Sequence, residues 1–573
     1  MGKQNSPHSG GPPKLSSKLH VPTPKPDLNR LYYGDNLQVL REYIADESVD
    51  LIYLDPPFNS RQDYNVLFAE KDGSRSASQI TAFKDSWEWN LEAERAYQEV
   101  VEGGGRVADA MRAFRTLLGG SDMLAYLAMM APRLIELRRV LKPTGSIYLH
   151  CDPTASHYLR ILMDGVFGPI GSVNEIIWKR YGAHNDVGQG SQHFGRVHDT
   201  IIFFSRGEVR KWNQLFTPLS DAYIESTYRH EENGRKFTTT PLTGPGGIQK
   251  GNPVYEWNGH TRAWRYSKET MQQLHDEGRH YYSRTGYVRQ KLFLEESRGV
   301  PVQDMWTDIP SLSGSNAERL GYPTQKPEAL LERILRASSN EGDLVLDPFC
   351  GCGTTIQVAQ KLNRRWIGID ITHLAINLIK NRLTDTFGEE IRKTYQVIGE
   401  PKDLNGAAQL ALENKYQFQY WALGNVDAQP AEQIKKGADR GIDGRKYFHD
   451  DRSGKSKQII FSVKGGKNVG VAEIRDLIGV LQREQAEIGV YISFEEPTKP
   501  MQREAAETGF YSSPAGGKYP RLQLLSIKDL LNDGKQVEYP RLLDATFKKA
   551  PKHRPAAATN LSLALSGAAE DEE

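Results

Sequence analysis

Two short segments of this 573-residue chain combine residues that could do chemistry. In the first, the apolar run 51–54 leads into Asp55, Pro56, Pro57 and Phe58. A strand would deliver the Asp55 carboxylate to its carboxyl end, and the two prolines would hold the following backbone extended without amide hydrogens. The segment therefore predicts a rigid rim that carries a hydrogen-bond acceptor and an aromatic ring. An ordinary strand-terminating turn also fits these residues, since Asp-Pro is common in turns.

The second segment, residues 344–355, reads LVLDPFCGCGTT and predicts a strand, a glycine-rich turn and the start of a helix. Gly351 and Gly353 remove side chains where a ligand must approach the backbone, and a helix N-terminus presents unpaired amides. A further apolar run ends about twenty residues later in Asp370, where a carboxylate would reach ribose hydroxyls. The pattern favours a pocket for an adenosyl cofactor. The alternative is a tight strand–helix turn with a surface aspartate.

Apolar runs that end in turn or acidic residues predict the strands that position both segments. They read VDLIYLDPPFN, GSIYLHCDP, DTIIFFSR, DLVLDPFCGCGTT and RWIGIDI. We expect these strands to run parallel, because they alternate with amphipathic stretches such as residues 123–141. The fold class predicted is α/β, with a doubly wound sheet.

Residues 207–310 break this rhythm, because they are rich in Tyr, Trp, Arg, His and Gly. We interpret them as an inserted recognition segment, since flat aromatic and cationic side chains suit contacts to bases and phosphates. The alternative is that these side chains pack against one another over a small core of their own.

Composition excludes several classes of protein. Lys and Arg number 73 against 72 Asp and Glu, so a basic surface can only be local. No apolar run approaches the roughly 20 residues of a membrane span. The three cysteines, Cys151, Cys350 and Cys352, are too few for a disulfide framework. The first residues lack the apolar core of a secretory signal, so we expect a cytoplasmic protein.

Changes in composition predict the domain organisation. Proline, serine, glycine and lysine dominate the beginning of the chain, and the end is polar and acidic, as in segments that cannot bury enough apolar surface to fold. A polar, turn-rich stretch divides the remainder. The predicted parts are a disordered basic arm at 1–27, a large domain at 28–390, a linker at 391–412, a smaller domain at 413–535 and a disordered tail at 548–573.

The order of the two chemical segments resembles the β group of DNA amino-methyltransferases that use S-adenosylmethionine. In that family an FxGxG cofactor motif, here residues 349–353, lies C-terminal to a (D/S)PP(Y/F) motif, here residues 55–58. Further matches are YGDN at 33–36, NEIIW at 174–178, HDTIIF at 198–203 and YPTQKP at 322–327. The resemblance covers about residues 28–390. It implies a Rossmann-like sheet in which both motifs share one crevice, and a target-recognition region within the insert.

The resemblance also implies roles for individual residues. The catalytic set is Asp55, Pro56, Pro57 and Phe58, and the cofactor contacts are Asp35, Lys326, Asp347, Phe349, Gly351, Gly353, Thr354 and Asp370. In the implied mechanism, the Asp55 carboxylate and the Pro56 carbonyl accept the hydrogens of the target amine, and Phe58 stacks on a base that has left the duplex. The partner is double-stranded DNA, and methyl transfer is expected to use no metal.

Several alternatives stay open. Aspartate at 55 with an aromatic residue at 58 favours adenine N6, whereas serine is frequent at the first position among N4-cytosine enzymes. An inactive DNA-binding relative and an enzyme for RNA or for protein glutamine are the other functions considered. The sequence does not decide whether the chain forms a homodimer or belongs to a restriction–modification system.

The smaller domain carries a second motif. Asp443 precedes a strand, 458–464, that ends in Lys464, and this order resembles the PD-(D/E)xK core of Mrr-like restriction enzymes. That core implies a nuclease-like α/β domain in which Asp443 helps to hold Mg²⁺ and the lysine polarises water. Ser462 stands where the family has Glu or Gln, and a hydroxyl binds the ion more weakly than a carboxylate. Compensation by Glu413, Asp439 or Glu473 is considered. Cleavage and a non-catalytic DNA-binding or assembly module are the two alternatives.

Overall fold

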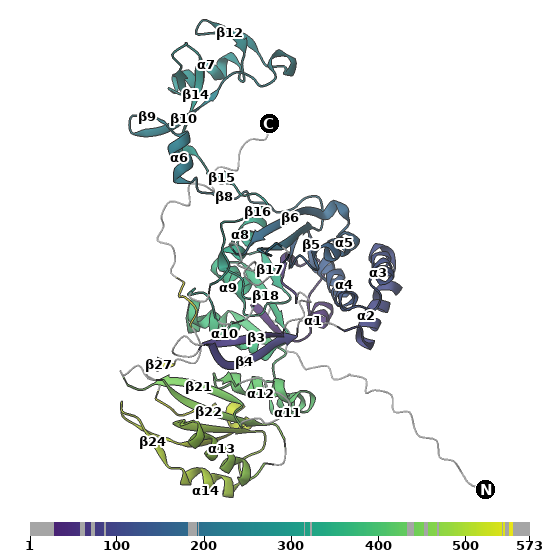
Figure 1. Cartoon of the computed structure of the whole chain (residues 1–573), viewed down its shortest axis with the longest axis vertical. Coiled ribbons are helices and arrows are strands. Elements are labelled where there is room, and N and C mark those ends of the chain that lie inside the picture. The colour runs from purple at the N-terminus through teal and green to yellow at the C-terminus, as the bar shows by residue number, and fades with distance from the viewer. Residues whose placement is uncertain are drawn as a thin grey trace, which may run out of the picture. The chain divides into compact units, whose positions relative to one another are not determined.

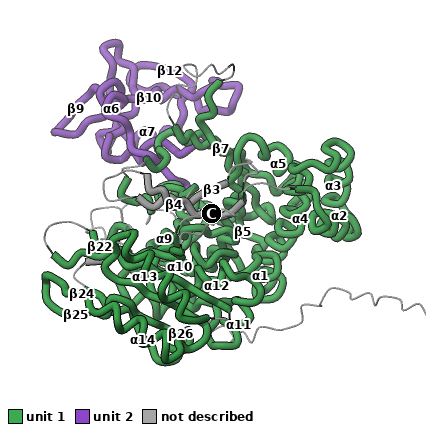
Figure 2. The backbone as a smooth tube through the Cα atoms, turned by 60° about the horizontal axis from the view of Figure 1, so that its bottom comes forward, with its two compact units in different colours: residues 1–213, 304–554 green, residues 214–303, 555–573 purple. Residues whose placement is uncertain are grey.

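The computed structural model describes residues 28–553, except 58–62, 70–74, 85–87, 182–191, 193, 314–315, 321, 323, 432–440, 452–455, 467–468, 541–542 and 545–548. For β3 (Asp63–Ala69), β4 (Arg75–Lys84) and β27 (Leu543–Asp544) only the backbone is described. The described residues up to Asn213 and from Asp304 onward form one compact unit, and Gln214–Gln303 belong to a second (Figure 2). The predicted arm at 1–27 lies outside the described residues, as does the predicted tail at 548–573 except for residues 549–553. Those five residues were predicted wrongly as disordered, because Ala550 is buried and its N donates to Asp385 Oδ2 at 3.2 Å.

A nine-stranded sheet organises the first unit (Figure 1). Across the sheet the strands are β16 (Met305–Trp306), β6 (Ser172–Lys179), β7 (His198–Ser205), β5 (Leu141–Cys151), β2 (Val49–Leu54), β17 (Leu344–Asp347), β18 (Arg365–Asp370), β1 (Asn29–Tyr33) and β19 (Tyr395–Ile398). Strands β5, β2, β17, β18, β1 and β19 are joined by parallel pairings. This is the doubly wound α/β arrangement predicted from the sequence.

Strand β2, which leads into Asp55, and strand β17, which leads into the glycine loop, are direct neighbours. Val345 pairs with Leu51 and Leu346 with Ile52 in parallel register. From this pair the chain adds β5 on one side and β18 on the other, so the winding of the sheet reverses between β2 and β17. Ligands bind at such reversals, outside the carboxyl ends of the strands.

One strand direction was predicted wrongly. The run DTIIFFSR forms β7, which is antiparallel to both β5 and β6. A parallel neighbour requires a crossover connection, whereas β6 and β7 follow one another in the chain and pair side by side. Burial on both faces gives β7 the same apolar composition as the parallel strands.

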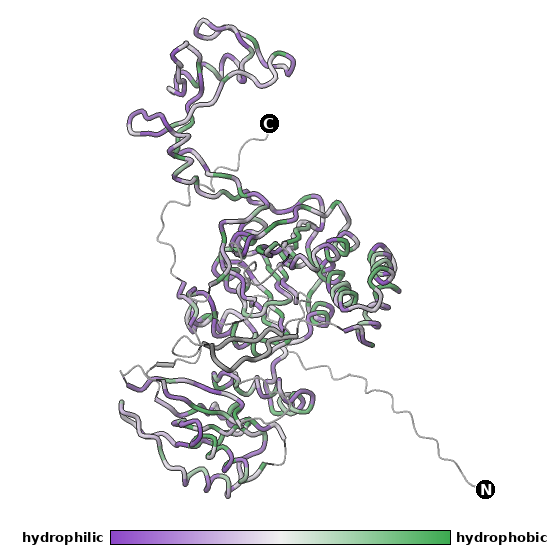
Figure 3. Tube along the Cα trace, in the orientation of Figure 1, coloured by the Kyte–Doolittle hydropathy of each residue, from purple (hydrophilic) through white to green (hydrophobic). Residues whose placement is uncertain are grey.

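Helices cover both faces of the sheet (Figure 1). One layer comprises α1 (Asn36–Tyr43), α2 (Leu91–Glu102), α3 (Gly105–Leu118), α4 (Asp122–Val140) and α5 (Ser156–Phe167). The other comprises α8 (Glu328–Ser338), α9 (Thr354–Lys361) and α10 (His373–Phe387). Every residue of β2 is buried between these layers, and hydrophobic residues gather along the central strands (Figure 3). The site therefore stands on a rigid, closely packed base.

The predicted linker, residues 391–412, contains regular structure. Tyr395 and Ile398 are buried in β19, which pairs with β1, so the large sheet extends past residue 390. Helix α11 (Leu404–Glu413) also begins inside the predicted linker. Because β19 has only four residues, it offers too short a pattern to stand out against the polar stretch beside it.

The second unit contains the predicted insert. Its elements are β8 (Phe216–Thr217), α6 (Asp221–Thr227), β9 (His230–Glu232), β10 (Arg235–Pro241), β11 (Val254–Trp257), β12 (His260–Ala263), α7 (Lys268–Asp276), β13 (His280–Tyr282), β14 (Val288–Phe293) and β15 (Val300–Pro301). A small core forms from Leu242, Trp264, Met271 and Val288. Arg235 lies over the Phe293 ring and Arg262 over the Tyr287 ring, so part of the aromatic and basic composition is used within the unit.

The C-terminal part of the first unit has its own sheet, in the order β20 (Gln429–Pro430), β21 (Gly444–His449), β22 (Lys457–Lys464), β23 (Ile488–Ser493) and β26 (Leu522–Ser526). A short hairpin pairs β24 (Phe510–Ser512) with β25 (Lys518–Pro520). The helices are α11, α12 (Lys415–Gly424), α13 (Val471–Arg483), α14 (Lys499–Glu507) and α15 (Ile527–Leu531). Among the described residues, none of the helices is long and apolar enough to cross a membrane.

Candidate active site

The two chemical segments line one cavity of about 750 Å³. Asp55, Pro56 and Pro57 contribute one part of its wall, and the glycine loop contributes another, with residues 347–352, Thr354 and Thr355. Pockets of this size accommodate small-molecule ligands. Asp35, Lys326 and Asp370, to which the family resemblance assigns cofactor contacts, line the same cavity. Phe58 lies outside the described residues.

Asp55 follows β2 and keeps one carboxylate oxygen available. Its Oδ2 forms an ion pair with Lys326 Nζ, which also donates to the carbonyl oxygen of Thr324 at 3.2 Å. Asp55 Oδ1 is buried and has no hydrogen-bond partner among the described residues. A buried acceptor without a donor is unfavourable unless a ligand supplies one. The ion pair also gives Lys326 a contact with the catalytic carboxylate that the sequence did not predict.

The glycine loop requires glycine at both predicted positions. Gly353 has φ of 77°, and a Cβ atom there would lie 2.7 Å from Ile379. Gly351 has φ of 49°, and its Cβ atom would lie 3.1 Å from the Tyr322 ring. Left-handed backbone and close packing both exclude larger residues. The loop therefore brings bare backbone to the cavity just before α9 begins.

Two acids at strand ends, the buried Asp347 and the partly buried Asp370, shape this loop. Asp370 Oδ2 accepts from Gly351 N at 3.0 Å and Oδ1 accepts from Thr372 N at 2.9 Å, and burial raises the pKa of Asp370 to about 6. Asp347 Oδ1 accepts from Phe349 N at 3.0 Å, and burial raises its pKa to about 7. A carboxylate has about four acceptor positions, so Asp370 can also receive ligand hydroxyls.

Asp35 is held by a partner that sequence reasoning missed. It caps α1 by accepting from Leu37 N at 2.9 Å, and it forms an ion pair with Arg133 at 2.7 Å. Arg133 Nε also donates to Asn36 Oδ1 at 2.6 Å, and Asn36 Nδ2 donates to the Pro348 carbonyl oxygen at 2.8 Å. These contacts tie the predicted cofactor residue to the glycine loop. Asn36 was part of a recognised motif, but nothing in the helical pattern of α4 distinguishes Arg133.

A buried polar chain runs beneath the cavity. The hydroxyl of Tyr53, which lines the cavity, lies 2.9 Å from His150 Nδ1, and His150 Nε2 lies 3.1 Å from Asp199 Oδ2. Burial lowers the pKa of His150 and favours its neutral form. The sequence predicts the strands that carry His150 and Asp199 but assigns these two residues no role. Their arrangement fixes the Tyr53 ring on the cavity floor.

The predicted nuclease-like site holds its aspartate in a different way. Asp443 Oδ1 accepts from Gln419 Nε2 at 2.8 Å, and Oδ2 accepts from Val463 N at 2.6 Å. Ser462 is buried, and Lys464 ends the same strand. Asp443 is therefore brought to the strand of Ser462 and Lys464, as predicted, but both of its oxygens are engaged by protein donors.

The acids considered as compensation do not complete a metal site. Glu473 Oε2 accepts from Gly470 N at 2.8 Å and caps its own helix, and the exposed Glu413 accepts from Gln409 at 2.8 Å. Asp439 lies outside the described residues. Among described residues, there is no group of three His, Cys, Asp or Glu that could hold a metal ion. Since Mg²⁺ prefers oxygen ligands that include carboxylates, the described residues do not fit this ion.

The first unit has a doubly wound sheet, and a glycine loop and a strand-end acid lie where its winding reverses. The same place holds a carboxylate oxygen without a partner among the described residues. These features define a Rossmann-like protein that can hold a small cofactor beside a second molecule. Comparison with known proteins specifies the class. The chain belongs to the DNA methylase family, whose model matches residues 49–381. Residues 414–531 match a second family, described as restriction endonuclease.

Individual relatives bear the names of methyltransferases and modification subunits. Type II methyltransferase M.EcaI of Enterobacter cloacae is 31% identical over 45% of this chain and 57% of its own length. The Mod subunit of the type III restriction-modification enzyme StyLTI of Salmonella typhimurium is 28% identical over 58% of this chain and 50% of its own length. The chain thus spans about half the length of these relatives. A crystal structure of an M1.HpyAVI–SAM complex is 14% identical and covers 62% of this chain and 98% of that one, with a TM-score of 0.29.

Proposed function

We propose that this chain is a site-specific DNA methyltransferase that transfers a methyl group from S-adenosylmethionine to the exocyclic amine of a flipped base. The observation that carries the proposal is Asp55 Oδ1, a buried acceptor that has no hydrogen-bond partner among the described residues and lies on the wall of the cavity that the glycine loop also lines. A donor group that enters beside the cofactor loop would satisfy this atom. Adenine N6 is the favoured target, and cytosine N4 is the alternative.

The cavity fits the proposed cofactor. Bare backbone at Gly351 on the cavity wall and the acid Asp370 at a strand end match the requirements of an adenosyl group. Gly353 is not among the lining residues and packs against Ile379 instead. Phe349, Thr354 and Asp347 complete the predicted contacts on this side, and Asp35 lies at the start of α1. When bound, S-adenosylmethionine supplies a methyl group that is activated by its sulfonium centre.

The residues of the chain prepare the target amine. Asp55 Oδ1 accepts one amine hydrogen and the Pro56 carbonyl the other, which directs the nitrogen lone pair towards the methyl group. The carbon–nitrogen bond forms as the carbon–sulfur bond breaks, and the surplus amine proton passes to Asp55 or to water. Lys326 holds the second oxygen of Asp55 and so fixes the direction of the first. Proximity and orientation supply most of the rate enhancement.

Recognition of double-stranded DNA is assigned to the second unit. Tyr223 and Tyr282 are exposed in this unit, and its Arg262 lies over the ring of Tyr287. Phe58 is proposed to stack on the flipped base, at an unstacking cost of a few kcal/mol. The three cysteines are free and buried, which suits the reducing cytoplasm where the chain is proposed to act.

Sequencing of modified bases tests this proposal. DNA from cells that express the chain should carry a methylated adenine at one defined sequence, and DNA from cells that express Asp55→Ala should not. Purified Asp55→Ala should still bind S-adenosylmethionine by calorimetry, because the glycine loop is intact. Methylation that persists in Asp55→Ala contradicts the assignment of Asp55. Methyl groups found on cytosine N4 would identify cytosine, and not adenine, as the target base.

A second function follows from the side chains that the C-terminal domain offers to a metal ion. We infer that this domain does not cleave DNA and acts as a binding or assembly module with a nuclease-like fold. The hydroxyl at Ser462 and the absence, among the described residues, of any group of three His, Cys, Asp or Glu that could hold a metal ion support this inference. Incubation of unmethylated DNA with Mg²⁺, beside a Lys464→Ala control, tests it, and Mg²⁺-dependent cleavage that is lost in the control would contradict it.

A further inference from the structure

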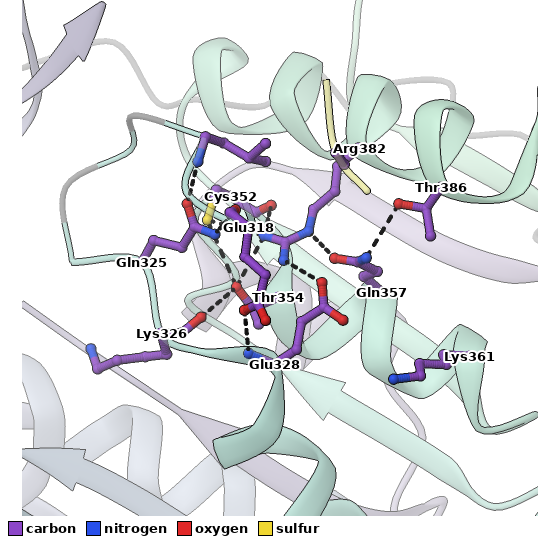
Figure 4. Close-up of polar contacts among 12 residues, drawn as sticks. Glu318, Gln325, Lys326, Glu328, Cys352, Thr354, Gln357, Lys361, Arg382 and Thr386 are labelled. Carbon is purple, nitrogen blue, oxygen red and sulfur yellow. Dashed lines mark hydrogen bonds and ion pairs between the residues drawn. The ribbon is translucent and has the colours of Figure 1, made fainter. Parts of the chain in front are cut away.

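A buried arginine connects the glycine loop to its surroundings. Arg382 in α10 is 2% exposed (Figure 4). Its Nη1 donates to Thr354 Oγ1 at 3.1 Å and to the Cys352 carbonyl oxygen at 3.3 Å, and its Nε donates to Gln357 Oε1. Arginine stays charged in proteins, so a buried guanidinium is costly unless its donors are paired. The guanidinium of Arg382 therefore binds Cys352 and Thr354, where the loop passes into α9, and Gln357 within α9.

The contacts continue from the loop to the catalytic carboxylate. Thr354 accepts from Arg382 and donates through the same hydroxyl to the carbonyl oxygen of Lys326 at 3.3 Å. The side chain of Lys326 then forms the ion pair with Asp55. Each link joins a different element, namely α10, the start of α9, the segment before α8 and the end of β2. Three successive contacts thus lead from Arg382 to the acid that receives the target amine.

The segment that carries Lys326 is also fixed from its other side. Glu328 Oε1 lies 3.6 Å from an Arg382 guanidinium nitrogen, and Glu328 N donates to Glu318 Oε2 at 3.1 Å. Gln325 Nε2 donates to the Glu318 carbonyl oxygen at 2.6 Å. Figure 4 shows these side chains converging on Arg382 and Thr354. The position of Lys326 therefore depends on the same buried cation as the position of the loop.

We propose that Arg382 is a positioning residue for methyl transfer, which keeps the cofactor loop and the Lys326–Asp55 pair in one fixed relation. The inference rests on the proposed function. Arg382 touches neither reacting atom, and it acts through Thr354 on Lys326. A displacement of 1 Å between reacting groups can lower a rate by about 10²-fold, so a rigid connection between these two parts of the cavity affects the transfer step directly.

A purely structural role would have a different signature. If Arg382 only holds α9 against α10, its loss would lower the fraction of folded protein and leave each folded molecule fully active. Single-turnover kinetics separate these cases. The amplitude reports the number of competent molecules, whereas the rate constant at saturating S-adenosylmethionine reports the geometry of those molecules alone.

The experiment uses the full chain, saturating S-adenosylmethionine and a duplex that contains the methylated site found by sequencing. Arg382→Met should lower the single-turnover rate constant by about 10²-fold. Arg382→Lys should lose less, because an ammonium can keep one contact but not the fork. Thr354→Val, which removes the hydroxyl at nearly constant volume, should also slow transfer, whereas Thr354→Ser should restore the rate. The matched control is Lys361→Met, since Lys361 is a cation of α9 that pairs with Glu332 at 3.0 Å, away from the loop.

The outcomes are distinct. Slower transfer at full amplitude in Thr354→Val, with rescue by serine and no effect of Lys361→Met, supports the proposal even if Arg382→Met does not fold. Wild-type rate constants with reduced amplitude in the Arg382 and Thr354→Val variants overturn it. If the wild-type chain transfers no methyl group to any DNA, the proposed function itself has failed, which is a different result from an active wild type with insensitive variants.

Discussion

The methyltransferase cavity and the nuclease-like site use similar residues at similar places but leave different atoms available. Asp55 follows β2 and Asp443 precedes β21, a lysine belongs to each predicted set, and glycines follow β17 in one sheet and β22 in the other. Asp55 keeps a buried oxygen without a partner among the described residues, whereas Asp443 has an oxygen engaged by Gln419 and another by the backbone of Val463. A motif identifies residue types, but the side chains gathered around them in the fold decide which ligand can be bound.

The two lysines give the largest expected contrast. Lys326→Met should lower methyl transfer by roughly 10²- to 10³-fold, because Asp55 loses the partner that orients it. Lys464→Met should leave methyl transfer unchanged, because Lys464 lies in the nuclease-like sheet. Tritiated methyl transfer measures both. Equal losses in the two variants would show that the lysines act on folding and would remove the contrast.

The glycines after the two strands sharpen the comparison at the level of stability. Gly353→Ala places a Cβ atom 2.7 Å from Ile379 at a φ of 77°, whereas a Cβ atom at Gly466 would meet none of the described atoms within 4 Å and needs no left-handed φ. Left-handed backbone costs about 1–2 kcal/mol and overpacking about 1–3 kcal/mol. Denaturant unfolding should therefore show Gly353→Ala destabilised by about 2–4 kcal/mol and Gly466→Ala within about 0.5 kcal/mol of the wild type. A neutral Gly353→Ala would mean that the loop can relax.

The affinity for S-adenosylmethionine should depend on pH in a way that only the first site explains. Burial raises the pKa of Asp370 to about 6, and the ionised carboxylate is the form that accepts ribose hydroxyls. Affinity should hold above pH 7 and weaken by up to about tenfold for each pH unit well below 6, because one proton must leave before binding. Calorimetry between pH 5 and 8 measures this, and Asp370→Asn should bind weakly with a flatter profile.

The stability of the fold should move in the opposite direction. A carboxyl whose folded pKa is raised holds its proton longer in the folded state than in the unfolded chain, so Asp370 and Asp347 make unfolding easier as pH rises from about 4 to about 7. If the affinity for S-adenosylmethionine falls as pH rises, as the stability does, the pH dependence would belong to folding and not to Asp370.

The sequence predicts the site well where residues adjacent in the chain act together. That Asp55 and the glycine loop share one crevice is what the family resemblance implies, and the ends of neighbouring strands in a doubly wound sheet do meet at one edge. The pairing of Lys326 with Asp55 could not be predicted, since the segment before α8 folds back across 271 positions of sequence. Arg382 was missed for a related reason. A single arginine within a helix is usually a surface residue, and only tertiary packing buries it.

The predictions of strand direction and of the domain limits were wrong for physical reasons as well. An apolar run indicates burial on both faces and is independent of direction, so β7 was assigned the parallel orientation of its neighbours. The four residues of β19 are too short for a periodic signal. In both cases the information lies in contacts between distant segments.

The smallest expected effect is the response of the wild-type chain to Mg²⁺. The described residues of the nuclease-like site offer one carboxylate, Asp443, and include no group of three His, Cys, Asp or Glu that could hold a metal ion. Millimolar Mg²⁺ should therefore leave the Tm unchanged, because a ligand that does not bind the native state cannot stabilise it. Ser462→Glu provides the matched test, since it adds a second carboxylate next to Asp443 on a buried strand. This variant should be less stable without the ion, through repulsion between buried acids, and should recover Tm as Mg²⁺ is added. A Tm increase in the wild type that disappears in Asp443→Asn would mean that the site does bind metal. Both regions could then bind a ligand, and they would differ only in which ligand they bind.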